Sequence, residues 1–288
     1  MELPIEKLGK KYELYLKLIK EKGHIDKHGF ILTEACDSLL FSGLLGCLPG
    51  ISTDITKAYN RHTQLWKRRP LTYEPCYPNH SKSTISRDMM LGLAWYCWIN
   101  KRKDIAEQVI KTTINKWGII GKYKNAEGFS RVIMTPGLLS TFCWISYKLG
   151  GPSRRFLRLP PAIISYRNKG YRAHLTVLHA LLREKIIKKS DGFNLESFIY
   201  HKAFSYQHNR QPMNPLYSFA SCHNSSAIDV LMDERFWPNE RLPTTLDRKG
   251  EWLPQRDFEG SSWKPDRSWV EHTGADFLFV AALVLDII

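Results

Sequence analysis

Two aspartates stand at the start of uncharged stretches, a placement that suits acid–base chemistry. Asp37 precedes ten residues without a charge, and Asp88 precedes ten more, Met89 to Trp98. A helix that is apolar on all sides is usually buried, and burial disfavours the charged form of a carboxyl group. Cleavage of a glycosidic bond requires two carboxyl groups, one as acid and one as base or nucleophile. Asp37 and Asp88 are therefore the first catalytic candidates, and Glu34 is the third.

Each of these carboxylates also has a structural explanation. Asp88 and Glu34 suit a first helical turn, where the helix dipole stabilises a negative charge by about 0.3–1 kcal/mol. Asp37 enters an uncharged stretch, and a buried carboxylate needs a partner. Arg87 or Arg131 could be that partner in an ion pair. Loss of stability rather than loss of turnover on mutation would then identify the structural role.

Other polar residues stand near the starts of further apolar stretches. Arg87 and Arg131 are candidates for binding a substrate carboxylate or phosphate, because a guanidinium forms bidentate hydrogen bonds with such groups. His272 and Asp276 are four residues apart, so they share a helix face if the helix begins early enough. That pair is either a proton relay or a satisfied core pair. The remaining candidates for substrate binding carry a ring: His174 and Trp269.

The elements that must position these residues are predicted to be helices almost throughout. Uncharged stretches alternate with amphipathic ones such as 4–21 and 104–117, and no run is typical of a strand. Ser86 and Thr135 suit the caps of two uncharged helices, with Pro136 at a first helical position. This order fits inner helices buried on all sides and outer helices buried on one side. We expect an all-α fold whose inner helix starts gather at one end.

The alternation resembles the alpha/alpha toroid, a barrel of helical hairpins seen in many glycan-active enzymes. The resemblance is one of architecture and covers nearly the whole chain. It implies a single alpha/alpha-barrel domain over residues 1–288, with an irregular loop region at 238–268. Trp252, Trp263 and Trp269 in and beside that region could roof a cleft and stack on sugar rings. The alternative is a loop held in place by buried indoles.

The charge of the chain indicates an anionic partner. Lys and Arg number 42 against 28 Asp and Glu, a net charge of +14, which favours binding of negatively charged polymers. The basic residues are scattered and no zinc-finger, homeodomain or RNA-recognition signature is present, so no specific nucleic acid is expected. With the toroid resemblance, the substrate expected is a polysaccharide or other anionic glycan, such as a cell-envelope polymer, and the activity is that of a glycoside hydrolase.

Two other functions stay open on the sequence. A toroidal polysaccharide lyase would use His, Tyr, Asn and Arg side chains, and His223 and Asn224 with Tyr217 offer such types. A non-catalytic basic scaffold would bind nucleic acid or an acidic surface, with affinity that falls steeply as salt rises.

Motifs for metals and cofactors are missing from the sequence. The six cysteines include no Cys-x-x-Cys pair, and there is no phosphate-binding loop, dinucleotide-binding glycine motif or His-Glu-x-x-His. We expect no metal and no cofactor.

The charged N-terminus does not resemble a signal peptide, and the apolar stretch 277–288 is too short for a membrane span. We expect cytoplasmic synthesis, with any release by lysis or another non-classical route. The sequence indicates no oligomeric state.

Overall fold

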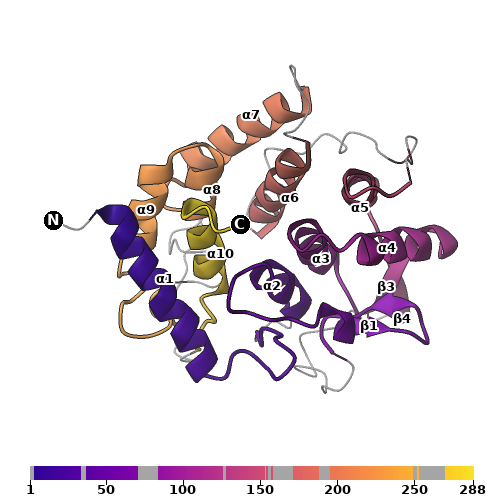
Figure 1. Cartoon of the computed structure of the whole chain (residues 1–288), viewed down its shortest axis with the longest axis horizontal. Helices are drawn as coiled ribbons and strands as arrows, with labels where there is room; N and C mark the ends of the chain where they lie inside the picture. Colours follow the sequence, from indigo (N-terminus) through magenta and orange to yellow (C-terminus); the bar gives the residue numbers. More distant parts are fainter. Residues whose placement is uncertain are drawn as a thin grey trace. The chain divides into compact units, whose positions relative to one another are not determined.

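The computed structural model describes residues 3–33, 37–70, 84–125, 128–152, 154, 157, 171–187, 195–248, 252 and 270–288. Over these residues the chain is mostly helical, as the sequence predicts, with ten α-helices and two small antiparallel sheets (Figure 1). A single domain is expected from the sequence, and the structure groups the chain into two compact units. Unit 1 comprises residues 1–24, 164–184 and 191–288, and unit 2 comprises residues 25–163 and 185–190.

The helices of unit 2 follow the predicted alternation. They are α2 (Ser38–Leu45), α3 (Arg87–Ile99), α4 (Lys103–Asn115) and α5 (Pro136–Lys148). Every residue of α2 is buried, and α3 and α5 are buried over most of their length because their central residues carry no charge. By contrast, α4 buries one apolar face, with Ile105, Val109 and Ile110 on it, and packs against α5. Short η1 (Ile55–Ala58), β1 (Tyr59–Asn60) and β2 (Leu65–Trp66) lie between α2 and α3 in the chain.

Two glycines allow α2 and α3 to pack closely side by side. A Cβ atom added to Gly43 would lie 2.3 Å from the carbonyl oxygen of Gly92, closer than any real Cβ contact. A Cβ on Gly92 would lie 2.4 Å from the carbonyl oxygen of Leu40. The two backbones are therefore in direct contact, which places the start of α2 near the start of α3.

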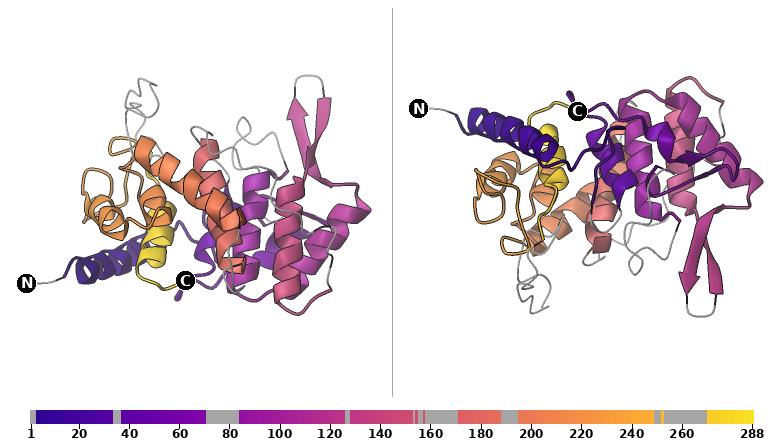
Figure 2. Two further views of the ribbon diagram at one scale, coloured as in Figure 1. Left: turned by 90° about the horizontal axis from the view of Figure 1, so that it is seen from above. Right: turned by 90° about the horizontal axis from the view of Figure 1, so that it is seen from below.

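A β-hairpin in unit 2 departs from the sequence-based expectation of helices alone. Strands β3 (Ile119–Asn125) and β4 (Gly128–Ile133) pair antiparallel, with Lys122 opposite Arg131. The last paired residues at the end of the hairpin are Asn125 and Gly128. The hairpin stands out from the helices of its unit (Figure 2). A short ribbon with lysines along one strand lacks the apolar alternation by which a buried strand is predicted.

Unit 1 contains the remaining helices. They are α1 (Pro4–Glu21), most of α6 (Tyr171–Ile187), α7 (Leu195–Arg210), α8 (Pro215–Ala220), α9 (Asn224–Met232) and α10 (Ala275–Val284). Helix α1 is amphipathic, and α10 is buried from Ala275 to Leu283. Within the described residues, no helix combines the length and the apolar character that crossing a membrane requires.

The helix starts agree only partly with the predicted caps. Thr135 caps α5 as predicted, since its side chain accepts a hydrogen bond from the N–H of Leu138, and Pro136 is the first helical residue. Ser86 precedes α3, but its hydroxyl makes no capping hydrogen bond. Thr33 lies before α2, which begins at Ser38, and its hydroxyl accepts from the N–H of Asp37 at 2.9 Å. Local sequence thus predicted the helices better than their first residues.

Candidate active site

The starts of α2 and α3 bring the two predicted catalytic aspartates into electrostatic contact. Asp37 immediately precedes α2, and Asp88 lies in the first turn of α3. The charge of Asp88 is one of the causes that shift the pKa of Asp37. The structure therefore brings together the pair that the sequence singled out, although the catalytic roles stay a prediction. Glu34 lies outside the described residues.

Asp37 is a carboxyl group with a perturbed acidity. Burial, and after it the negative charge of Asp88, raise the pKa of Asp37 to about 6. Arg68 opposes this shift, because its Nη1 donates a hydrogen bond to Oδ1 of Asp37 at 3.0 Å. A second carboxylate nearby disfavours the charged form of the first. Asp37 therefore keeps its proton to a higher pH than an ordinary aspartate does.

Arg68 is a residue of the candidate site that no pattern in the sequence singles out. Its main chain links the two helix starts: its carbonyl accepts the N–H of Leu39 at 2.7 Å, and its N–H donates to the carbonyl of Thr84 at 3.1 Å. The guanidinium is thereby aimed at Asp37, and the two side chains are only 16% and 18% exposed. In the sequence Arg68 belongs to a basic run, Lys67 to Arg69, that looks like an ordinary solvated charge cluster.

The sequence offers Arg87 and Arg131 as ion-pair partners of Asp37 or as residues that bind a substrate anion. Both side chains are exposed, which is not the environment of an enclosed cavity. The Nε of Arg87 donates to the carbonyl oxygen of Ile133 at 3.1 Å, and Arg131 stands on β4 opposite Lys122. The ion-pair partner of Asp37 is Arg68 instead. Contact of either arginine with a substrate stays a prediction.

A second polar cluster, in unit 1, surrounds Asp276. Both carboxylate oxygens of Asp276 accept hydrogen bonds from Arg248, at 2.6 and 2.8 Å, and Oδ2 also accepts the N–H of Trp252 at 2.8 Å. The side chains of Arg248 and Asp276 are 0% and 4% exposed. A bidentate pair with an added main-chain donor satisfies a buried carboxylate well. No pattern in the sequence identifies Arg248 as the partner of Asp276.

The histidines predicted to bind substrate also belong to this cluster. His174 is fully buried and stacks on Trp252, with ring centroids 5.4 Å apart, so Trp252 is a buried indole. Burial lowers the pKa of His174 to about 3 and, together with the positive charge of Arg248, lowers the pKa of His272 to about 4. Both rings are neutral at neutral pH. His272 lies before α10, which begins at Ala275, so His272 and Asp276 do not share a helix face.

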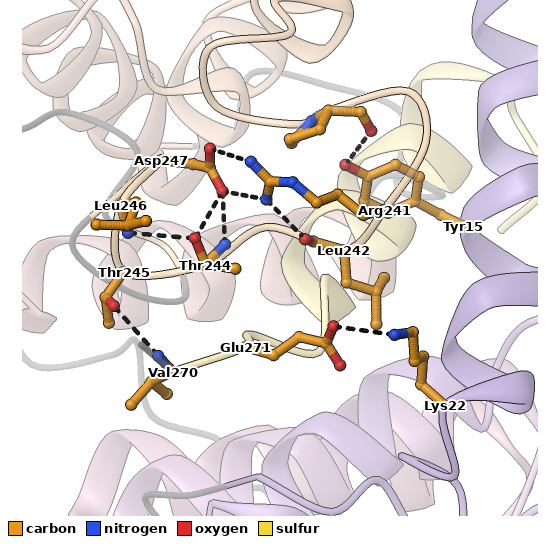
Figure 3. A network of polar contacts seen from close by, with 11 residues as sticks. Tyr15, Lys22, Arg241, Leu242, Thr244, Thr245, Leu246, Asp247, Val270 and Glu271 are labelled. Carbon is orange, nitrogen blue, oxygen red and sulfur yellow. Dashed lines mark hydrogen bonds and ion pairs between the residues drawn. The ribbon is translucent and has the colours of Figure 1, made fainter. Parts of the chain in front are cut away.

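The irregular region is anchored at its described ends (Figure 3). Arg241 binds both oxygens of Asp247, at 2.6 and 2.8 Å, and Asp247 accepts two hydrogen bonds from Thr244. Glu271 forms an ion pair at 3.6 Å with Lys22, which follows α1. These contacts hold the chain just before Arg248 and again just before Asp276. Trp263 and Trp269 lie outside the described residues.

Comparisons with known proteins do not identify a functional site, so the candidate site is argued from the contacts described above. No family model, curated protein or solved structure matches the chain. Among the described residues, no group of three or more His, Cys, Asp or Glu side chains is placed to hold a metal ion. Of the thiols in that part of the chain, Cys47, Cys97 and Cys143 are buried. The pair of Asp37 and Asp88 with Arg68 is therefore the best-defined candidate site.

Proposed function

We propose that this protein is a glycoside hydrolase that cleaves an anionic or cell-envelope polysaccharide. The observation that carries the proposal is the half-buried carboxyl of Asp37, whose pKa is raised to about 6 by burial and by the charge of the second carboxylate, Asp88. Protonation of a glycosidic oxygen near neutral pH requires an acid whose pKa is raised, and its partner must be ionised. The raised pKa of Asp37 suits the acid role, and Asp88, in the first turn of α3, is the candidate for the second carboxylate.

The chemistry assigns a separate role to each side chain. Asp37 gives its proton to the leaving glycosidic oxygen as the bond to the sugar breaks, and Arg68 stabilises the carboxylate that remains. Asp88 either attacks the anomeric carbon or takes a proton from the water that attacks it. Carboxyl groups about 5–5.5 Å apart favour the first route with retention, and about 6.5–9.5 Å the second with inversion. The configuration of the first product formed therefore distinguishes the two routes.

The anionic class of substrate rests on charge. The chain carries a net charge of +14, and clefts of one sign concentrate substrates of the other. Arg87 stands next to Asp88 in the chain with an exposed guanidinium, where it is available for a substrate carboxylate. Replacement by lysine should weaken anionic substrates more than neutral ones, because lysine lacks the planar fork.

We also propose that the helices form an alpha/alpha toroid, a ring of helical hairpins. Support comes from α2, α3 and α5, which are buried along most of their length, and from α4, which is amphipathic and packs against α5. In a ring of helical hairpins, the first three helices would be inner and α4 outer. An experimental structure with α2 or α3 on an outer surface would contradict this arrangement.

The test is a screen of the purified protein against anionic polysaccharides and peptidoglycan, scored by new reducing ends. Asp37→Asn and Asp88→Asn should each lower turnover by about 10²–10⁴-fold, the usual contribution of acid–base catalysis. Asp229→Asn is the matched control, because Asp229 is exposed on α9. Full activity of either variant would end that residue's catalytic role. A product that absorbs in the ultraviolet, from an unsaturated uronate, would indicate a lyase, and the absence of any product would favour the scaffold.

A further inference from the structure

We propose that the outer face of α4, together with Trp117, is a second binding site, for an anionic oligosaccharide, separate from the aspartate pair. The ligand class rests on the proposed function, and the site itself rests on the geometry of unit 2. None of Asp37, Arg68 and Asp88 lines the cavities described below. The site would hold the polymer rather than cleave it.

Two adjoining cavities follow α4. The first has a volume of about 440 Å³ and is lined by residues one turn apart, among them Glu107, Lys111 and Asn115. The second, also about 440 Å³, shares Asp104 and Gln108 with the first and continues toward Tyr59 and Arg61. Each volume is in the range of small-molecule sites. Two such cavities in line fit an extended chain of sugar rings better than one compact ligand.

The charges in the cavities favour an anion. Glu107 accepts two hydrogen bonds from Arg154, at 2.7 and 2.5 Å, and a further one from Ser146. Asp104 is paired in the same bidentate way with Arg102, at 2.9 and 2.7 Å. Each acid is thus neutralised by an arginine.

The basic residues of the cavities complete the charge balance. Lys111 and Arg61 are exposed, and within the described part of the chain neither forms an ion pair. They leave the two cavities with an excess of positive charge once both acids are paired. Carboxylate or sulfate groups on a sugar chain would be attracted to these positions.

Trp117 lies just beyond the C-terminal end of α4, and its exposure is the second observation. Trp117 is 90% exposed, and its main-chain N–H donates to the carbonyl of Ile114, a residue that lines the first cavity. Its φ of 54° belongs to the cap that ends α4, where the main-chain N–H groups of Trp117 and Gly118 donate to the carbonyls of Ile114 and Thr113. The exposed indole does not help to build a core.

The indole and the polar groups together favour a sugar over a protein partner. An indole presents a flat apolar face, which suits the C–H face of a sugar ring. The carboxamides of Gln108 and Asn115 and the ammonium of Lys111 suit its hydroxyl and acidic groups. The centre of a protein interface is instead depleted of charged residues. A second copy of the chain or another protein is therefore an outcome for the test to detect.

The test uses the full chain in affinity electrophoresis with polygalacturonate as the anionic probe and dextran as the neutral one. Trp117→Ala should raise the Kd for polygalacturonate by at least about tenfold, as for other exposed aromatic anchors. Lys111→Gln should raise it about threefold at low salt, and Lys111→Arg should restore it. Phe198→Ala is the control, because Phe198 is 49% exposed on α7, in unit 1, and should leave the Kd unchanged.

The outcomes separate this inference from the proposed hydrolase. Binding that Trp117→Ala loses and Asp37→Asn keeps supports the second site, whether or not any product forms. Equal binding by Trp117→Ala and the natural chain overturns the site, even if the polymer is hydrolysed. No binding to polygalacturonate overturns it as well. A dimer in light scattering that Trp117→Ala dissociates would assign the face to a second copy and would also overturn it.

Discussion

Asp37 shows how a single half-buried residue can indicate a function. Its carboxyl has a partner in Arg68, yet burial and the charge of Asp88 outweigh that partner and raise its pKa to about 6. A carboxyl group kept only for structure is expected to have a lowered pKa once an arginine binds it, because the charged form is then favoured. Glu107 behaves in that way, since the hydrogen bonds from Arg154 lower its pKa.

The raised pKa predicts a particular dependence of stability on pH. Between 3.8, the ordinary pKa, and about 6, the folded state holds a proton on Asp37 that the unfolded state has released. The free energy of unfolding should therefore fall as pH rises through this window, by about 3 kcal/mol for a shift of this size. Asp37→Asn lacks this effect, so its stability relative to the natural chain should increase from pH 4 to pH 6.

Urea unfolding at a series of pH values measures this difference. Asp229→Asn controls for the loss of a surface charge, and its curve should run parallel to that of the natural chain. If the Asp37→Asn curve is parallel as well, the pKa of Asp37 is not raised, and the acid role proposed for it loses its support.

At the scale of elements, the contact between α2 and α3 determines where the two carboxyl groups lie. Gly43 meets the main chain of Gly92, and Gly92 meets that of Leu40. The backbone atoms in contact belong to regular helices and have little freedom to shift. A small separation of α2 and α3 would change the distance between Asp37 and Asp88, on which the proposed chemistry depends.

Gly43→Ala should therefore destabilise the protein by about 1–3 kcal/mol, the usual effect of overpacking a core. In an open helical position the same change stabilises by about 0.5–1 kcal/mol. Gly9 in α1 provides that control, because an added Cβ would meet nothing within 4 Å. Chemical denaturation of both variants gives the comparison. An increase in stability for Gly43→Ala would show that α2 and α3 do not pack at this contact.

At the scale of the whole molecule, each of the two units has a carboxylate at a helix start that an arginine binds. In unit 2 Asp37 is only partly neutralised, whereas in unit 1 Asp276 receives two hydrogen bonds from Arg248 and one from the N–H of Trp252. The well-paired carboxylate of Asp276 suits a structural role, and the carboxyl of Asp37, whose pKa is raised, suits chemistry. Mutation of Asp276 should therefore lower mainly stability, and mutation of Asp37 should lower mainly turnover.

Asp276→Asn should lower the free energy of unfolding by about 3–5 kcal/mol, because it leaves the buried Arg248 without its counter-charge. Glu21→Gln, which removes an exposed ion pair with Lys17 in the same unit, should cost less than about 1 kcal/mol. Thermal unfolding and hydrogen exchange measure both effects, with protection lost first in α10. Normal stability with loss of turnover in Asp276→Asn would assign this carboxylate to catalysis instead.

Local sequence by itself determined the helices and the candidates at their starts. The uncharged run after Asp37, the run after Asp88 and the Thr135–Pro136 cap are signals within one or two helical turns, the range over which helix periodicity and capping act. Only the tertiary structure decided the partners. Arg68 lies 31 residues from Asp37, and Arg248 lies 28 residues from Asp276. Such pairs depend on where intervening loops bring the chain back, and loop paths carry little periodic signal.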